Sequence, residues 1–323
     1  MTYAQAAAAA LADAMRTDSR VVALGEDLGR GGVFGQYRSV DAQGRVVTLQ
    51  SEFGIGRVID TPISEANIIG AAVGMALAGL KPVVELRVVD FALCGMDELV
   101  NQAAKNRYMF GGQGRVPLVA RMPIGIWSAS AAQHSQSLEA WFAHIPGLVV
   151  AVPGTPDDNY GLLASAIACG DPVIYMEHKE LWGVQGEVDR APIPLGRARI
   201  ERAGSDITVV SWGLQLQRCL EAAQTLAPHG IACEVINLRT LWPWDRDGVL
   251  ASVARTGRLL VVHEAVQVAG FGAEIAATVA EQTGAPVRRL GAPRIPVGYA
   301  QVLEDESRIG APRIAEEIRQ WLK

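Results

Sequence analysis

Short apolar segments rich in β-branched residues alternate with longer helical segments along the whole chain. Four such segments occur before residue 155: RVVAL, which ends just before Gly25, then PVVEL, VPLVAR and GLVVAVP. Strands of this kind, separated by helices, are typical of a parallel sheet covered by helices on both faces. The alternation therefore predicts the α/β class. It also places reactive loops at the carboxyl ends of the strands, where Glu26, Glu65, Asp90 and His134 are expected to meet in one crevice.

The alternation is interrupted between Trp182 and Ser205, where apolar periodicity is lost and Pro, Gly and Arg accumulate. Such a composition is typical of linkers. A chain of 323 residues suits two α/β domains of ordinary size. We therefore expect a parallel α/β domain at residues 1–185, a linker at 186–204 and a smaller α/β domain at 205–323, with strands in DITVVSWG, ACEVINLRT and RLLVVHE.

Composition and charge exclude several classes of function. Half of the residues are hydrophobic, a fifth are charged, and the formal net charge of -5 gives no reason to expect nucleic acid or an anionic membrane as a partner. The longest apolar run, Ile68 to Leu80, is too short to span a bilayer and predicts a buried helix. The N-terminal segment carries Asp13 and lacks a basic start, so it is not expected to be a signal sequence. The four cysteines form no CxxC pair, which suits structural thiols in a reducing cytoplasm.

A single carboxylate, Glu65, stands at the head of this apolar run. Ser64 is a good N-cap and the helix dipole favours an acid in the first turn, so a capping role explains Glu65 in one way. The following turns, IIGAAVGMALAG, are apolar on every face and predict burial, and a buried carboxylate needs a partner or a proton. On residue type, both a capping and a functional role for Glu65 stay open.

A second candidate, His134, lies in the loop AAQHSQSLEAW among amides and hydroxyls. No G-x-S-x-G motif presents the neighbouring Ser135, so a serine hydrolase is not expected. A lone histidine is often structural, but a polar loop after a strand is a frequent place for acid-base and binding groups. His144, among apolar neighbours, is expected to be packed. The glycine clusters GRGGVFG and FGGQG fit no nucleotide-binding pattern and predict loops.

Several motifs occur in a fixed order along the chain. They are GEDLGRGGVFG, RVIDTPISE, GMALAGLKPVVE, NQAAKNRYMFGGQ, AAQHSQSLEAW, HIPGLVV, DPVIYMEHKELW, DITVVSWG, VINLRTLWPWD, GRLLVVHEA and GFGAEIAA. This ordered set resembles the β subunit of the thiamine-diphosphate-dependent E1 component of 2-oxo acid dehydrogenase complexes, in the transketolase-like superfamily. The resemblance covers nearly the whole chain. It implies a pyrimidine-binding-type domain followed by a transketolase C-terminal-like domain.

The resemblance implies roles for five residues. In the family, the glutamate matched by Glu65 hydrogen-bonds the aminopyrimidine ring of thiamine diphosphate and favours its imino tautomer, which takes the proton of the thiazolium carbon. Phe91 would pack against the aminopyrimidine. His134 would face the reacting carbon, where it stabilises charge or assists acyl transfer to a lipoyl group. Glu26 and Asp97 would be further carboxylates near the path that couples two active sites.

The resemblance also implies metals and partners. Family members hold a monovalent cation such as K⁺ near the positions matched by Leu118, Ala166, Ile167, Cys169 and Asp171, although Cys169 and Asp171 depart from the common family residues. The family binds Mg²⁺ and the diphosphate through a G-D-G motif, which this sequence lacks. The resemblance therefore implies an E1 α subunit that holds both, in an α2β2 heterotetramer with part of the apolar helix after Glu65 and of Gly270 to Ala277 in interfaces. A lipoyl-bearing E2 acyltransferase would be a further partner.

The substrate is only partly indicated. The segments VVDFALCGMDE, EHKELW and QGEV favour the pyruvate and acetoin branches of the family over the branched-chain branch, and they do not separate pyruvate from acetoin. The expected function is therefore decarboxylation of a 2-oxo acid or cleavage of acetoin, with the acyl unit passed to E2. Two alternatives stay open: the C-terminal half of a split transketolase, which moves a two-carbon ketol unit, and a scaffold subunit without catalytic function.

Overall fold

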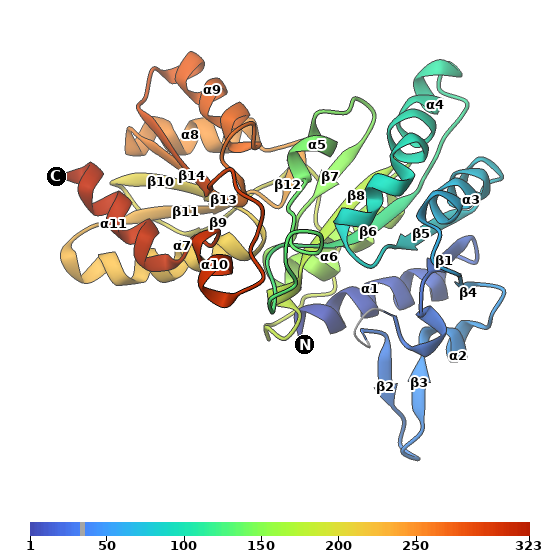
Figure 1. The fold of residues 1–323 in the computed structure, drawn as a ribbon. Helices are drawn as coiled ribbons and strands as arrows, with labels where there is room; N and C mark the ends of the chain where they lie inside the picture. Colours follow the sequence, from blue (N-terminus) through green and yellow to red (C-terminus); the bar gives the residue numbers. More distant parts are fainter. Residues whose placement is uncertain (33–35) are drawn as a thin grey trace.

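The first of two α/β units is built on a seven-stranded sheet. The computed structural model describes residues 1–32 and 36–323 (Figure 1). The strand order is β12-β7-β8-β6-β5-β1-β4, and every neighbouring pair is parallel except β12 with β7. The strands are β1 (Val21–Gly25), β4 (Val58–Asp60), β5 (Lys81–Glu85), β6 (Val119–Ile124), β7 (Val149–Ala151), β8 (Val173–His178) and β12 (Thr240–Trp242). The predicted parallel α/β architecture is confirmed.

Helices cover both faces of this sheet. On one face α1 packs against α6, and on the other α3 lies beside the 3-10 segment η3. The helical segments are α1 (Tyr3–Thr17), η1 (Leu28–Arg30), α2 (Leu49–Phe53), α3 (Glu65–Leu77), η3 (Val89–Gly95), the π-helical η4 (Glu98–Ala103), α4 (Ala104–Met109), α5 (Glu139–Ala143), α6 (Pro156–Ala168) and η5 (Lys179–Leu181). A hairpin of β2 (Arg38–Val40) and β3 (Val46–Thr48) projects from the body of this unit (Figure 1).

The second unit contains a five-stranded sheet in the order β14-β13-β10-β11-β9. Its strands are β9 (Arg199–Arg202), β10 (Ile207–Ser211), β11 (Cys233–Asn237), β13 (Leu259–Val266) and β14 (Val287–Ala292), all in parallel pairs except β9 with β11. Its helices are α7 (Gly213–Leu226), η6 (Ala227–His229), α8 (Arg246–Thr256), α9 (Gly272–Thr283), α10 (Gln301–Glu306) and α11 (Ala311–Leu322). One apolar cluster runs from the first sheet into this unit, so the two units share a core.

Two strands depart from the sequence-based expectation. Residues 199–202, expected in the linker, form the edge strand β9, which pairs antiparallel with β11. Residues 232–240, expected as one strand, are divided by Arg239, which adopts a left-handed conformation with φ 64°. The Arg239 carbonyl accepts the Val152 N–H at 2.8 Å and directs β12 across to the first sheet. The second unit therefore supplies the outermost strand of the first sheet.

Helix α3 is buried on one face only, which corrects the expectation of a fully buried helix. Ile68, Ile69, Ala72, Val73 and Ala76 lie against the sheet. The opposite face is exposed, and Leu77 keeps 51% of its surface accessible. The sequence is apolar on both sides, so periodicity carries no information on which side faces the core.

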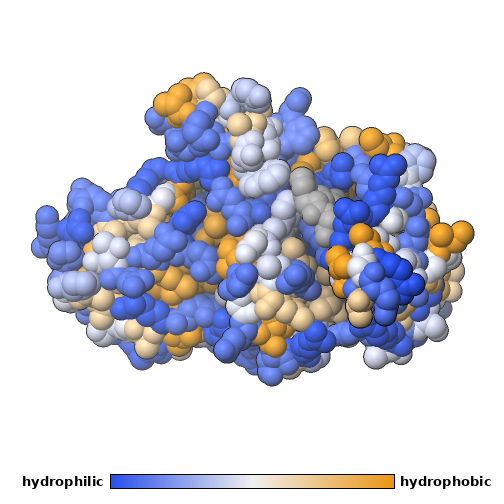
Figure 2. Space-filling view, turned by 90° about the horizontal axis from the view of Figure 1, so that it is seen from below, coloured by the Kyte–Doolittle hydropathy of each residue, from blue (hydrophilic) through white to orange (hydrophobic). Residues whose placement is uncertain are grey.

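The surface is mixed in polarity. Figure 2 shows one side of the molecule, on which hydrophilic residues predominate and hydrophobic residues form separate patches. Across residues 1–32 and 36–323, no helix combines the length and apolarity needed to cross a bilayer. All four cysteines are free thiols: Cys219 and Cys233 are buried, Cys169 is half-buried and Cys94 is exposed. His144 is exposed, so the expectation that it is packed in the interior is wrong.

Candidate active site

Two acidic side chains meet at the carboxyl ends of β1 and β4, which are adjacent and parallel. Glu26 follows β1 directly, and Glu65 begins α3 after the loop that follows β4. Both are buried, with 7% and 8% of their surface exposed. Burial raises the pKa of Glu26, the negative charge of Glu65 raises it further, and Arg87, with Nε 3.8 Å from Glu26 Oε2, opposes the shift. The predicted convergence of Glu26 and Glu65 is confirmed.

The Glu65 carboxylate has no hydrogen-bond donor among the described residues. Ser64 occupies the N-cap position, but its hydroxyl accepts from Asn67 Nδ2 at 2.8 Å and makes no capping bond to the helix. Ser64 is therefore the N-cap residue by position, without a side-chain capping bond. The residue as a whole is buried, but neither carboxylate oxygen is among the fully enclosed unpaired polar atoms of the described residues, so both stay open to solvent and to a ligand that donates a hydrogen bond.

Phe91 and His134 form the second part of the site. The Phe91 and His134 rings meet edge to face, with centroids 5.2 Å apart and planes at 85°. Gln136 Nε2 donates to Asp90 Oδ1 at 2.7 Å, which ties the histidine loop to η3. His134 is exposed, whereas Asp90 is buried. The chain thus presents an imidazole at the surface on a firmly attached loop.

Segment η3 connects the two parts. Phe91 lies near its start, and Gly95 at its end packs on α3: a Cβ at Gly95 would overlap Ile69 Cδ1 and lie 3.3 Å from the Glu65 carbonyl oxygen. One short segment therefore contacts the helix that carries Glu65 and the loop that carries His134. Glu26, Glu65, Phe91 and His134 follow the parallel strands β1, β4, β5 and β6 in that order, so all four lie at the carboxyl edge of the sheet.

Asp97 does not join this group. Its carboxylate is exposed and accepts hydrogen bonds from Asn101 at 2.7 Å and Gln102 at 3.1 Å, which lower its pKa. No contact with Glu26 or Glu65 is present in the described part of the chain. These bonds connect Asp97 to η4, the helix that follows it, and its predicted place near a path between active sites stays a prediction.

The residues predicted to hold a monovalent cation lie together at the opposite end of the strands. The Leu118 carbonyl accepts the Val173 N–H at 2.8 Å, and the Ala166 carbonyl accepts the Cys169 N–H at 3.2 Å. The Asp171 carboxylate is engaged by the Arg107 guanidinium. Ile167 is buried nearby on α6. Among the described residues, no cluster of three His, Cys, Asp or Glu side chains offers a metal site, so a cation here would depend on carbonyl oxygens.

The loop after β1 is held by a buried ionic cluster that sequence reasoning missed. Arg121 is 1% exposed, and its guanidinium lies 2.6 Å from Glu177 and 3.1 Å from Glu85. It also donates to Gln36 Oε1 at 3.1 Å, and Tyr37 stacks over it at 5.4 Å. The cluster therefore fixes the far end of the loop that begins with Glu26.

The glycine cluster in this loop is only partly described. Gly31 and Gly32 have φ 110° and 73°, and a Cβ on either would overlap the side chain of Arg38 or Tyr37. These two positions therefore require glycine for conformation and space. Val33–Gly35 of the same cluster lie outside the described residues.

Comparison with known proteins agrees with this geometry. Residues 1–184 match the family described as transketolase, pyrimidine binding domain, and residues 196–314 match transketolase, C-terminal domain. The chain is 44% identical over 320 residues to the acetoin:2,6-dichlorophenolindophenol oxidoreductase subunit beta of Cupriavidus necator, covering 96% of this chain and 94% of the relative. It is 41% identical over 310 residues to the pyruvate dehydrogenase E1 component subunit beta of Rickettsia bellii, covering 94% and 93%.

The chain belongs to the E1 β-subunit family of 2-oxo acid and acetoin dehydrogenases. This E1 β subunit also shares its fold with a solved structure titled split gene transketolase, inactive beta4 tetramer, at a TM-score of 0.81 and 21% identity, covering 100% of this chain and 98% of the other. The predicted family and the predicted pair of domain types are confirmed.

Proposed function

We propose that this chain is the catalytic β subunit of an E1 enzyme that decarboxylates a pyruvate-type 2-oxo acid or cleaves acetoin and passes the acyl unit to the lipoyl group of E2. The observation that carries the proposal is Glu65: its carboxylate stays open to a ligand, has no donor among the described residues and lies beside a second acid of raised pKa. The high identity to acetoin and pyruvate dehydrogenase β subunits supports the same reading.

The residues fit thiamine diphosphate. Glu65 can accept a hydrogen bond from a ring nitrogen of the aminopyrimidine, and Phe91 offers an aromatic surface to the same ring. When bound, thiamine diphosphate supplies a nucleophilic carbon that attacks the substrate carbonyl and holds the resulting charge. In this proposal, Glu65 controls the proton on the aminopyrimidine, and His134 faces the reacting carbon.

Metal ions and partners belong to the same proposal. Mg²⁺ and the diphosphate would be held mainly by an E1 α subunit, since this chain has no G-D-G motif. The working enzyme would be an α2β2 heterotetramer, with each cofactor between an α and a β chain. The exposed apolar face of α3 supports an interface there, because buried helices in such assemblies need no polar side.

Replacing Glu65 by glutamine in the complex purified with its α subunit tests the proposal. Loss of the carboxylate should lower kcat about 100-fold or more, the usual contribution of a positioned acid or base, while the heterotetramer still forms. The control is Glu316→Gln on the exposed surface of α11, which should keep full turnover. Unchanged turnover in Glu65→Gln would favour a scaffold subunit instead.

To identify the substrate, the complex is assayed with pyruvate, branched-chain 2-oxo acids, acetoin and sugar phosphates. Turnover is measured as reduction of a dye that accepts the electrons. Activity on pyruvate or acetoin is expected. Activity on sugar phosphates alone would select the split transketolase, whose fold this chain shares. His134→Ala should impair lipoyl acylation more than cofactor affinity, and a variant with normal acylation would refute the assigned role.

A further inference from the structure

The loop from Gly125 to Gln136, which carries His134, has a strained backbone. Ser128, Ala129 and Ala131 have φ of 50°, 54° and 57°, a left-handed conformation that residues with a Cβ rarely adopt. Such a conformation persists only where surrounding groups fix it. The groups that fix this loop therefore decide where His134 lies.

Three side chains from elsewhere bind the backbone of this loop. Glu264 Oε1 accepts the Ile126 N–H at 2.7 Å, and Glu304 Oε2 accepts the Ala129 N–H at 2.8 Å. Lys179 donates to the carbonyl of His134 itself. Glu264 lies on β13 and Glu304 on α10, so two of the three anchors come from the second unit.

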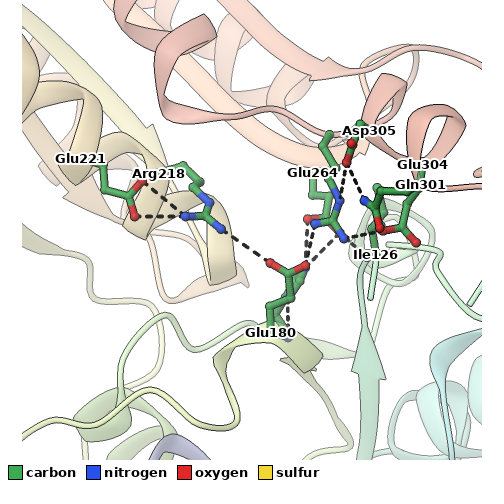
Figure 3. A network of polar contacts seen from close by, with 10 residues as sticks. Ile126, Glu180, Arg218, Glu221, Glu264, Gln301, Glu304 and Asp305 are labelled. Carbon is green, nitrogen blue, oxygen red and sulfur yellow. Dashed lines mark hydrogen bonds and ion pairs between the residues drawn. The ribbon is translucent and has the colours of Figure 1, made fainter. Parts of the chain in front are cut away.

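The anchoring acids are themselves held in place, as Figure 3 shows for the residues around Glu180. Glu304 is fully buried, and its second oxygen accepts from Arg308 at 2.7 Å. Arg308 also donates to Glu180 at 2.6 Å. Because one oxygen of Glu304 faces Arg308 and the other faces Ala129, the carboxylate has a single orientation.

Glu264 is held by His178. The His178 Nε2 lies 2.9 Å from both Glu264 oxygens, and its Nδ1 accepts the Glu180 N–H at 3.1 Å. Since Nδ1 accepts, Nε2 carries the proton and donates to Glu264. His178, the last residue of β8, is followed directly by Lys179 and Glu180, so the end of this strand joins both acids and the histidine loop.

We propose that Glu264 and Glu304 are positioning residues that act from the second unit on the loop of residues 125–136 and so place His134 for acyl transfer. The inference rests on the proposed function, because it uses the role of His134 given there. If Glu264 and Glu304 only held the two units together, they would not need to accept hydrogen bonds from backbone N–H groups of this loop. Both acids accept such a bond.

A double-mutant cycle in the α2β2 complex tests the proposal. Glu304→Ala should lower kcat for acylation of a free lipoyl domain about 10-fold to 100-fold, with KM and the Kd of thiamine diphosphate within about 2-fold. His134→Ala combined with Glu304→Ala should be no slower than His134→Ala alone, because one residue acts through the other. Multiplied effects in the double variant would overturn the proposal.

Two further variants guard against a fold defect. Glu304→Gln keeps an acceptor for the Ala129 N–H, so it should recover most of the acylation rate. Glu221 is the outermost acid of the same ionic network, on the side away from the loop, and pairs with Arg218 at 3.1 Å. Glu221→Gln should therefore leave acylation unchanged. Equal loss in Glu221→Gln, or no recovery in Glu304→Gln, would overturn the positioning role.

Hydrogen exchange tests the same proposal without an activity assay. If Glu304 fixes the loop, Glu304→Ala should speed amide exchange in residues 125–136 at least 10-fold while α11 is unchanged. Unchanged exchange in the loop would overturn the proposal. The proposed function is tested separately by Glu65→Gln. Normal turnover in that variant would contradict the proposed function, whatever the Glu304 variants show.

Discussion

Gly125 lies so close to His178 that no side chain fits between them. A Cβ on Gly125 would overlap the imidazole and lie 2.7 Å from Glu264 Oε1, and the residue has φ 91°. This close approach allows His178 to reach Glu264 while β6 continues into the histidine loop. The contact is thus the point where β6, β8 and the second unit meet.

Gly125→Ala is expected to destabilise the fold and slow acyl transfer. The strain of a left-handed alanine and the overlap with His178 together should cost about 2–4 kcal/mol. The matched control is Gly44→Ala, which has φ 75° and no atom within 4 Å, and which should show only the smaller cost of strain. Urea unfolding measures both, and equal losses in the two variants would contradict the packing argument.

The pH dependence of stability should depend on Glu26. Its pKa is raised by burial and by Glu65, so the folded chain holds the proton more tightly than the unfolded chain does. This group therefore stabilises the fold below its unfolded pKa of about 4.5, and that contribution falls as pH rises through the raised folded value. Glu26→Gln should flatten the decrease in Tm between weakly acidic and neutral pH. If Tm falls equally with pH in the unchanged protein and in Glu26→Gln, this contribution of Glu26 is excluded.

Arg121 is expected to be essential for the first unit. Arg121→Met removes the guanidinium from between Glu85 and Glu177, both of which are buried, and breaking such a group costs about 3–5 kcal/mol. Arg319→Met removes a guanidinium from an exposed ion pair on α11 and should change little. Denaturant midpoints compare the two. A mild effect of Arg121→Met would mean that the carboxylates take up protons at little cost.

If the monovalent cation that the resemblance implies near Leu118 and Ala166 binds there, it should stabilise the fold. Each carbonyl accepts one N–H and keeps a second lone pair for a cation. If K⁺ binds there, KCl should raise Tm by about 2–4 °C over choline chloride at equal ionic strength. Identical values in the two salts would argue that the Arg107 ion pair to Asp171 leaves no place for the ion.

The local part of the site was predictable from the sequence. Glu26 and Glu65 follow adjacent parallel strands, and that alone brings them together. The positions of Phe91 and His134 follow from the motifs that resemble E1 β subunits. The hydrogen bonds that Asp97 accepts from Asn101 and Gln102 are not revealed by the motif.

The remote part was not predictable. Glu264 and Glu304 act on residues 138 and 175 positions away in the sequence, so no local pattern connects them to the histidine loop. From the sequence, the short strand β12 was predicted as part of β11. The turn at Arg239 that separates them depends on contacts with the distant residues Val152 and Asp158. For α3, the apolar sequence predicts burial but does not say which side faces the core and which side is left for another chain.

The crossing of β12 into the first sheet has a consequence for synthesis of the chain. Until Trp242 has left the ribosome, β7 has no neighbour on its outer side, and its N–H and C=O groups stay open to any passing strand. The first unit therefore cannot finish folding when its own last residue emerges, and about sixty further residues must follow. We therefore expect the outer edge of β7 to be open to wrong strand pairing during that interval.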